Sequence, residues 1–312
     1  MKVSIVMCSY NAEEYVGPAI ESIIHQTYTN WELLIVDDAS TNNTSDVIKT
    51  YLGDPRIQLI EQPRNIGYLR NKNYGFTLAT GDLITQLDSD DTCPSDRLQK
   101  QVAVFTHHPE IQICGSNYCQ IDQYGTPLPH KEYPADFIIS EPGGDYPFWF
   151  PGLMFRSSIV EEFGLFSEYF IDFYGDDHYW TIRVNQKYPI YFIKDVLYHY
   201  RVNPNSMTNS LKNPRQMIVT EVIDFLNKQQ QETGTDCLER GNPEELLQFE
   251  QSLLHSKTIM SEKYRIWAAR ALDMNKFGSA RQLLNEAFRL NKWNMNYYRT
   301  LKYFYTKKYF SK

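Results

Sequence analysis

The sequence predicts an α/β fold, a mostly parallel sheet flanked by helices, with a C-terminal α-helical extension. Short apolar runs alternate with segments of helical spacing over roughly the first 115 residues. Such alternation is typical of a parallel sheet with helices on both faces. The last hundred or so residues show helical spacing without further strand patterns. The chain has 312 residues, 42% of them hydrophobic, which is enough for a sizeable core and more than one unit.

The expected strands are short apolar runs that end at polar or turn residues. They lie at 3–7, 31–36, 57–60, 83–87 and 111–114. Between them apolar residues recur at helical spacing, so helices are expected at 16–24, 46–52, 68–80 and 95–107. Near the C-terminus, 263–291 predicts a pair of helices, and the polar stretch 229–244 predicts a linker or loops.

Composition excludes several classes of protein. A net charge of -7 argues against a general nucleic-acid binder. The five cysteines form no C-x-x-C pair, and their odd number and scattered spacing indicate reduced thiols in a cytosol. No apolar run is long enough to span a membrane, and the N-terminus enters a strand without a signal-peptide pattern. The expected location is therefore the cytoplasm.

The most informative segment is 81–91, where an apolar strand ends in three carboxylates within four residues. These are Asp88, Asp90 and Asp91. Like charges this close repel one another, and carboxylate oxygens suit hard cations such as Mg²⁺ or Mn²⁺. The segment therefore indicates a metal site. The alternative is an acidic loop that caps a helix.

Three expected strands carry polar groups at their carboxyl ends, namely at 9–11, 37–38 and 88–90. Parallel strands point the same way, so these groups should converge where open α/β sheets bind ligands. Ordinary turn chemistry is the alternative for each of them. The sequence has no G-x-G-x-x-G after the first strand and no G-x-x-x-x-G-K-[ST], which argues against a dinucleotide-binding fold and a P-loop enzyme.

Four segments resemble, in order, motifs of the family 2 glycosyltransferases, which have the GT-A (Rossmann-like) fold. They are 3–11, 26–40, Asn65 with Gly67, and 81–91, the last of which looks like the family's D-x-D element. Together these motifs are specific, although each alone is weak. The resemblance covers roughly residues 1–210 and implies a catalytic domain at 1–212. Within it, 1–117 is the expected nucleotide-sugar half and 118–212 the acceptor half, while 213–312 is a helical region.

The resemblance implies an inverting glycosyltransferase that depends on Mn²⁺ or Mg²⁺. Such an enzyme moves a sugar from a nucleotide-sugar donor, here a UDP-sugar, to a hydroxyl of a saccharide or lipid-linked acceptor. Cell-surface polysaccharide or glycan synthesis is the implied setting. A noncatalytic sugar- or partner-binding module on the same fold is the alternative, and it would be expected to lose the metal or base carboxylates.

The resemblance also implies roles for residues around the donor. Those expected to bind the nucleotide-sugar are Cys8, Tyr10, Asp38, Lys72, Asp88 and Ser89. Asp90 is the expected metal ligand, and Asp91 is expected to support the structure. Lys72 stands where the family usually has an arginine that faces the pyrophosphate. The compact charge of an ammonium therefore replaces the forked hydrogen-bond donors of a guanidinium. Arg70 is a candidate to compensate.

On the acceptor side, the resemblance implies that Trp149, Gly152 and Met154 contact the acceptor, although an aromatic stretch there also fits simple packing. Asp176 and Asp177 match the acidic pair of the family's E-D-x-x-L-x-x-R element, with Arg183 in its basic place. Asp177 is then the catalytic base and Asp176 its neighbour. The alternative is that two acids stabilise a helix N-terminus.

Two features near the C-terminal end leave their role open. Many family members have a histidine where Asn203 stands, and His199 is a candidate replacement. The segment 292–312 holds six basic residues and no acid, interleaved with aromatic rings. That composition fits either an interfacial helix on an anionic membrane or an ordinary docking helix with a basic end.

Overall fold

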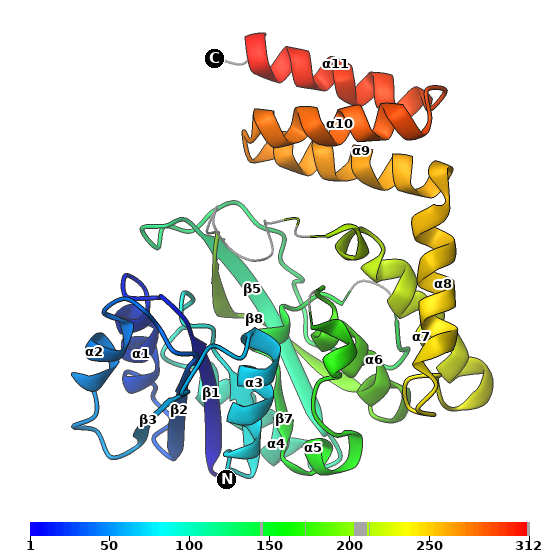
Figure 1. The fold of residues 1–312 in the computed structure, drawn as a ribbon. Helices are drawn as coiled ribbons and strands as arrows, with labels where there is room; N and C mark the ends of the chain where they lie inside the picture. The colour runs from blue at the N-terminus through cyan, green and yellow to red at the C-terminus, as the bar shows by residue number, and fades with distance from the viewer. Residues whose placement is uncertain (144–145, 172, 203–210, 212, 311–312) are drawn as a thin grey trace. The chain divides into compact units, whose positions relative to one another are not determined.

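The computed structural model describes the chain except for residues 144–145, 172, 203–210, 212 and 311–312 (Figure 1). The chain divides into two compact units. The first comprises Met1–Ile171 and Asp176–Asn203, and the second comprises Asp172–Gly175 and Pro204–Lys312. The expected residue Asn203 lies outside the described residues.

The first unit is built on one eight-stranded sheet in the order β3-β2-β1-β4-β7-β5-β8-β6. Its strands are β1 Val3–Ser9, β2 Trp31–Asp37, β3 Ile57–Glu61, β4 Leu83–Gln86, β5 Ile113–Ile121, β6 Phe137–Ile139, β7 Met154–Arg156 and β8 Ile190–Arg201. The strands β1 to β4 are parallel, as are β5 and β8, whereas β7 runs antiparallel between β4 and β5. The predicted, mostly parallel α/β sheet is therefore confirmed.

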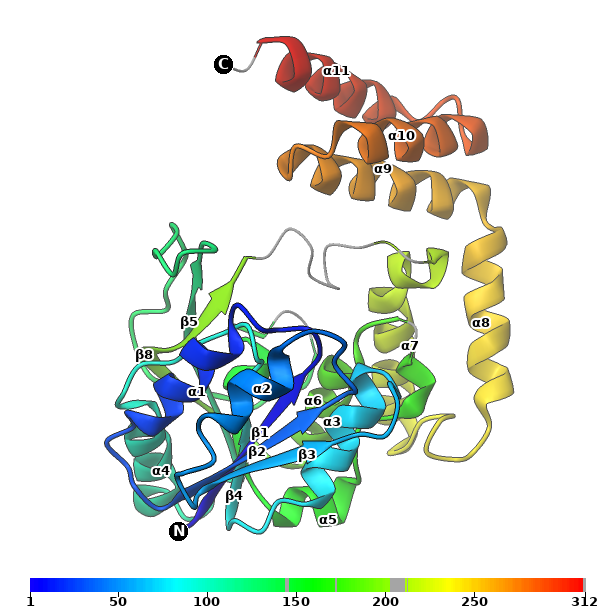
Figure 2. The same ribbon diagram turned by 60° about the vertical axis from the view of Figure 1, so that its left-hand side comes forward.

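Helices cover both faces of this sheet. They are α1 Val16–Ile24, α2 Thr44–Lys49, α3 Tyr68–Thr77, α4 Arg97–His107, α5 Ser158–Phe163 and α6 Asp176–Lys187. Alternate residues of a strand point to opposite faces. Accordingly Ile5 and Met7 join one core cluster with residues of α1 and α4, while Val6 faces α3. Figure 2 shows α1 and α4 on one side of the sheet and α3 on the other.

A glycine brings α3 unusually close to the sheet. A Cβ at Gly75 would lie 2.6 Å from Cγ1 of Val6 and 3.1 Å from Cγ2 of Val36. No larger residue fits there without moving β-branched side chains, which have little rotamer freedom. The close approach fixes α3 against β1 and β2, and α3 carries Lys72 towards the carboxyl edge of the sheet.

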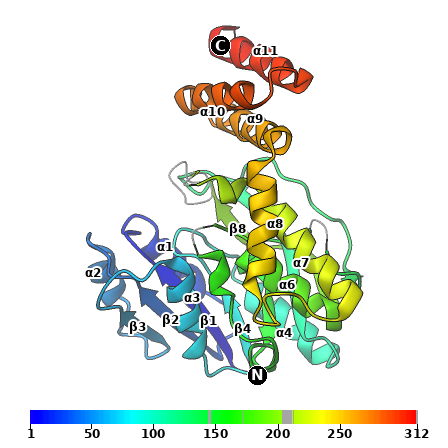
Figure 3. The ribbon, with the colours of Figure 1, turned by 45° about the vertical axis from the view of Figure 1, so that its right-hand side comes forward.

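The second unit is helical. Its long helices are α7 Val219–Thr233, α8 Pro243–His255, α9 Lys257–Asp273, α10 Phe277–Leu290 and α11 Met295–Phe310. The last three share a core in which Leu272, Leu284 and Phe304 are buried (Figure 3). The predicted helix pair at 263–291 is present as α9 and α10. Within the described chain, no helix combines the length and apolar character needed to cross a membrane.

Two predicted boundaries were wrong. The expected linker at 229–244 overlaps the end of α7 and the start of α8, and only the stretch between these helices is non-helical. There Gly234 ends α7 in the left-handed conformation that favours glycine, with φ 76°. The strand expected at 111–114 begins at Ile113 and extends to Ile121, because its polar residues are buried and mask the apolar pattern.

Candidate active site

The polar strand ends converge as expected. In the register of β1 and β2, Ser9 lies opposite Asp37, and the next residue, Asp38, donates its N–H to the Ser9 carbonyl at 2.8 Å. Beyond β4, the N–H of Leu87 bonds to the carbonyl of Val6 at 3.1 Å. The carboxyl ends of these three neighbouring strands therefore meet at one edge, which is the ligand edge of an open α/β sheet.

The two acids after β2 play different structural parts. Both carboxylate oxygens of Asp37 accept hydrogen bonds from Ser40, one from its N–H and one from its hydroxyl, so Asp37 stabilises the turn. Asp38 accepts the N–H groups of Ile66 at 2.7 Å and Gly67 at 3.0 Å. These bonds hold the loop that starts α3. Burial raises the pKa of Asp38 in spite of them.

Of the residues expected to meet the nucleotide base, Tyr10 is the accessible one. Its side chain is 49% exposed at the carboxyl edge, and its flat ring is available for stacking. Cys8 is buried in β1, and burial raises the pKa of its thiol, which stays protonated. Ser89 is buried beside the acidic turn.

Asp88 and Asp90 are two half-buried carboxylates that lie close together in the acidic turn. Asp88 accepts a hydrogen bond from Nε2 of Gln86 at 2.6 Å. Burial and the charge of Asp90 raise the pKa of Asp88 to about 6, and burial raises that of Asp90. In the described part of the chain, no three His, Cys, Asp or Glu side chains are grouped so as to hold a metal ion by themselves. Mg²⁺ in nucleotide sites is typically held by only one or two carboxylates plus the substrate's phosphates, and this pair fits that requirement.

Asp91 is tied to the far side of the sheet. Its two oxygens accept the hydroxyl of Tyr198 at 2.6 Å and the N–H of Arg201 at 2.7 Å. Burial, then the charges of its two acidic neighbours, raise the pKa of Asp91 well above its usual range. With both oxygens engaged inside the protein, Asp91 serves to anchor the acidic turn to β8.

Arg201 reinforces the same anchor. Its guanidinium donates to the carbonyl oxygens of Asp90 at 2.7 Å and Asp122 at 3.0 Å. Sequence reasoning gave no role to Arg201, although it stands two residues after His199 in the same segment. The His199 backbone bonds with Thr92, and burial lowers the pKa of its imidazole. No described cluster joins His199 to the acidic pair as a metal ligand.

The structure gives Lys72 a partner that the sequence did not indicate. Its ammonium is 1% exposed and donates to Oδ2 of Asp176 in a buried ion pair. The same ammonium lies 3.9 Å from the ring centroid of Phe166, a cation–π distance. Arg70, the proposed substitute, instead pairs with Glu168 at 3.1 Å, where both side chains are more than half exposed.

This ion pair distinguishes the two acids at the start of α6. Asp176 is committed to Lys72, whereas Asp177 is partly exposed and accepts one hydrogen bond, from the N–H of His178 at 2.7 Å. Burial and the negative charge of Asp176 raise the pKa of Asp177, and Lys72 opposes the shift. A carboxylate with a raised pKa and free lone pairs suits a general base.

The residues expected to contact the acceptor differ in accessibility. Trp149 is partly exposed and lies against the rings of Tyr118 and Tyr200, at centroid distances of 5.8 and 4.5 Å. Gly152 is buried in a 3-10 turn, Phe150–Gly152, and Met154 is fully buried in β7. Packing accounts for Gly152 and Met154, and only Trp149 presents surface to a ligand.

The sequence model of Glycosyl transferase family 2 matches residues 4–184. The chain belongs to this family, as its resemblance predicted. CgeD of Bacillus subtilis (strain 168) is 30% identical over 226 residues, covering 68% of this chain and 52% of CgeD. The β-1,3-glucosyltransferase WfgD of Escherichia coli is 39% identical over 116 residues, covering 37% of this chain and 45% of WfgD. The chain thus spans about half the length of these curated relatives.

Solved structures agree on the fold. The crystal structure of residues 1–349 of TarS from S. aureus superimposes with a TM-score of 0.56 at 16% identity. The match covers 98% of this chain and 81% of that chain. At this level of identity the likeness concerns the fold alone.

Proposed function

We propose that this protein is an inverting glycosyltransferase that transfers a sugar from a UDP-sugar to a hydroxyl of a saccharide or lipid-linked acceptor. The observation that carries the proposal is the difference between the two acids at the start of α6. Lys72 neutralises Asp176 and leaves Asp177 available as a base. The matched TarS structures contain UDP-GlcNAc and UDP. WfgD is named for UDP-Glc and an α-D-GlcNAc-diphosphoundecaprenol acceptor. Both names support a UDP-sugar donor, and that of WfgD supports a lipid-linked acceptor in cell-surface polysaccharide or glycan synthesis.

In the proposed mechanism Asp177 removes the proton from the acceptor hydroxyl as its oxygen attacks the anomeric carbon. The bond from that carbon to the nucleoside diphosphate breaks on the opposite side, so a single displacement inverts the centre. The buried ion pair keeps the start of α6 in place, which holds the base in line with the attacking oxygen. Tyr10, the accessible residue at the carboxyl edge, is the proposed stacking contact of the nucleotide base, and Asp38 holds the loop before α3 at the same edge.

We assign the divalent cation, Mg²⁺ or Mn²⁺, to Asp88 and Asp90. Loss of solvation raises the pKa of both carboxyls, and the charge of Asp90 raises that of Asp88 further, so a cation would be a favourable addition to this pair. When bound, the ion would offset negative charge on the departing diphosphate.

Asp90→Asn is expected to lower the affinity for UDP in the presence of Mn²⁺ by about tenfold or more, because the variant removes one of the two carboxylates that would hold the ion. Calorimetric titration of UDP, with and without Mn²⁺, measures this on the wild type and the variant. The thermal stability of the ion-free variant should equal or exceed that of the wild type, since one of two repelling charges is gone.

Each outcome of the titration has a distinct meaning. If the affinity for UDP changes neither with Mn²⁺ nor with the substitution, Asp90 is not a metal ligand. Absence of UDP binding by a folded wild type would exclude a UDP-sugar donor. It would also favour the alternative, a noncatalytic module. The presence of both the carboxylates assigned to the metal and those at the start of α6 argues against that alternative.

We further propose that the catalytic domain ends near residue 212 and that the helical region contacts the inner face of an anionic membrane from the cytoplasm. On α11, Tyr298, Lys302, Tyr305 and Tyr309 recur at spacings of four, three and four, so they share one exposed face. Just before the helix, Trp293 is 89% exposed. A surface that combines aromatic rings with positive charges and carries no acidic residue is complementary to the anionic headgroups of a membrane.

The double variant Lys302→Glu/Lys308→Glu reverses the charge of two exposed lysines of α11. It is expected to reduce binding to vesicles of phosphatidylcholine and phosphatidylglycerol by about tenfold or more. Co-sedimentation of the full chain measures the bound fraction, with pure phosphatidylcholine vesicles as the neutral comparison. Lys228→Glu, at a side chain of α7 that is 72% exposed, is the matched control. Equal sedimentation of the wild type with neutral and anionic vesicles would exclude the electrostatic contact.

A further inference from the structure

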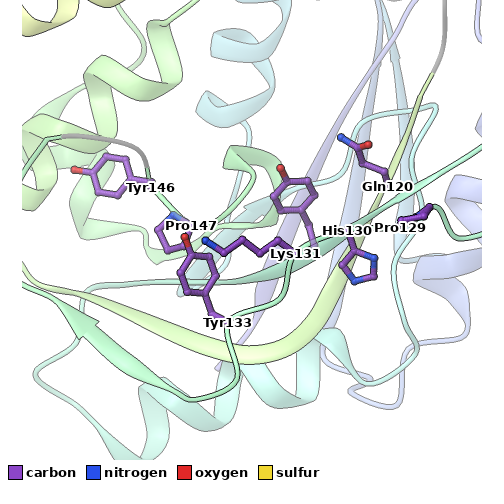
Figure 4. A pocket seen from close by; sticks show the side chains of 8 residues that line it. Gln120, Pro129, His130, Lys131, Tyr133, Tyr146 and Pro147 are labelled. Carbon is purple, nitrogen blue, oxygen red and sulfur yellow. The ribbon is translucent and has the colours of Figure 1, made fainter. Parts of the chain in front are cut away.

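A cavity of about 260 Å³ lies in the first unit, lined by residues to which no role has been assigned above (Figure 4). Tyr118 and Gln120, two positions apart on β5, line it from the same face of the strand. The loop 129–133 and Tyr146 complete the wall. Drug-sized sites occupy roughly 300–1,000 Å³, so this cavity suits a single sugar unit better than a long chain.

The cavity is connected to both parts of the proposed acceptor side. The ring of Tyr118 lies 5.8 Å from that of Trp149, the partly exposed aromatic residue described above. The ring of Tyr146 lies 5.6 Å from that of His178, the residue after the proposed base, in an edge-to-face contact. A molecule in the cavity would therefore lie on the acceptor side of the site.

Three tyrosines give the cavity the character of a saccharide site. The rings of Tyr118, Tyr133 and Tyr146 present flat apolar surfaces, against which the C–H faces of a sugar ring pack. The hydroxyl of Tyr146 donates to Oδ1 of Asn185 at 3.1 Å, which fixes that ring. The amide of Gln120 adds a donor and an acceptor for sugar hydroxyls.

Lys131 adds a positive charge to the wall of the cavity. The ammonium of Lys131 lies 5.0 Å from the ring centroid of Tyr133, and in Figure 4 the side chain extends towards Tyr133 and Pro147. Within the described chain no carboxylate pairs with Lys131. The neighbouring acid Glu132 is engaged by Nε2 of His130 at 2.7 Å. The positive charge of Lys131 is thus available to a ligand.

We propose that this cavity is an acceptor subsite for a saccharide that carries an anionic group, a carboxylate or a phosphate, and that Lys131 selects the anion. The inference rests on the proposed glycosyltransferase function and adds the chemical class of the acceptor. The tyrosine rings hold the sugar, and Lys131 forms a charge-assisted hydrogen bond with its anionic substituent.

Saturation-transfer NMR on the full chain tests the subsite with three sugars: methyl β-D-glucuronoside, glucose 6-phosphate and methyl β-D-glucoside. Inorganic phosphate, which has no C–H protons to observe, is added as a competitor of glucose 6-phosphate, and its affinity is read from the loss of the glucose 6-phosphate signal. The two acidic sugars are expected to bind about tenfold more tightly than the neutral glycoside. Lys131→Gln should remove that difference and leave binding of the neutral glycoside unchanged. Lys228→Gln, which removes one exposed positive charge from α7, should have no effect.

Two results would overturn the proposal. Equal affinity for acidic and neutral sugars would exclude selection by charge. Inorganic phosphate binding as tightly as glucose 6-phosphate would mean that the sugar ring is not recognised. Calorimetry of UDP on the same variants separates this inference from the proposed function, because UDP affinity should be the same in the wild type and in Lys131→Gln. If UDP binds and none of the sugars does, the subsite fails while the donor site stands.

Discussion

Replacing Asp177 with Asn is expected to lower the rate of sugar transfer by about 10²–10⁴-fold while leaving UDP affinity unchanged. The amide keeps the size of the side chain but cannot accept the proton of the acceptor hydroxyl. The loss of transferase activity is measured as the rate at which UDP is released from the donor at a saturating acceptor concentration. Asp224→Asn, the same chemical change at an exposed position of α7, is the control. Activity within about threefold of the control would exclude Asp177 as the base.

The pH dependence of the rate gives an independent test of the same assignment. Asp177 acts only when deprotonated, so activity falls as pH decreases through its pKa. Because burial and Asp176 raise that pKa, the acid limb should lie above the usual range of an aspartate. In Asp176→Asn one cause of the shift is removed and the charge of Lys72 is no longer neutralised, so the limb should move to lower pH. A limb that does not move would contradict the electrostatic coupling of the pair.

Lys72→Met is expected to lower the free energy of unfolding by about 3–5 kcal/mol. The substitution leaves Asp176 buried without its counter-ion, and the lost attraction is not replaced by water. Urea unfolding at pH 7.5 measures the change. The double variant Lys72→Met/Asp176→Leu should recover most of the stability, since replacing both members of a buried pair by apolar residues is often neutral or better.

Arg70→Met is the matched control for that experiment. Arg70 lies on the same helix, two residues earlier, and its ion pair with Glu168 is exposed on both sides. Exposed pairs contribute about 0–1 kcal/mol, so the control should change stability little. If Lys72→Met and Arg70→Met cost the same, the buried pair would not be the stabilising feature inferred from its burial.

The parts of the fold that the sequence predicted are those with local periodicity. The four parallel strands β1 to β4 are apolar runs bounded by turn residues, and alternation with helices defines their arrangement. By contrast β7, Met154–Arg156, is three residues long, too short for any period to show. Its Met154 was therefore assigned to an acceptor surface, although the strand lies buried between β4 and β5.

The candidate site divides in the same way. The acidic turn and the pair at α6 carry local motifs, and they were predicted from spacing and resemblance. The pairing of Lys72 with Asp176 joins residues 104 apart in the sequence, and that of Asp91 with Tyr198 joins residues 107 apart. No local pattern encodes such contacts, because they depend on how the sheet brings distant segments together. From the sequence alone, Lys72 was therefore predicted to face the ligand, although its ammonium is buried against Asp176.

These long-range contacts also set an order of events during translation. Lys72 and Asp91 leave the ribosome about a hundred residues before their partners do. At roughly 5–20 residues per second, the nascent chain waits about 5–20 s for them. During that interval the nucleotide half of the sheet must keep an ammonium and a carboxylate solvated rather than buried. A fragment that ends before α6 and β8 stays in that state, so it is not expected to form the donor site by itself.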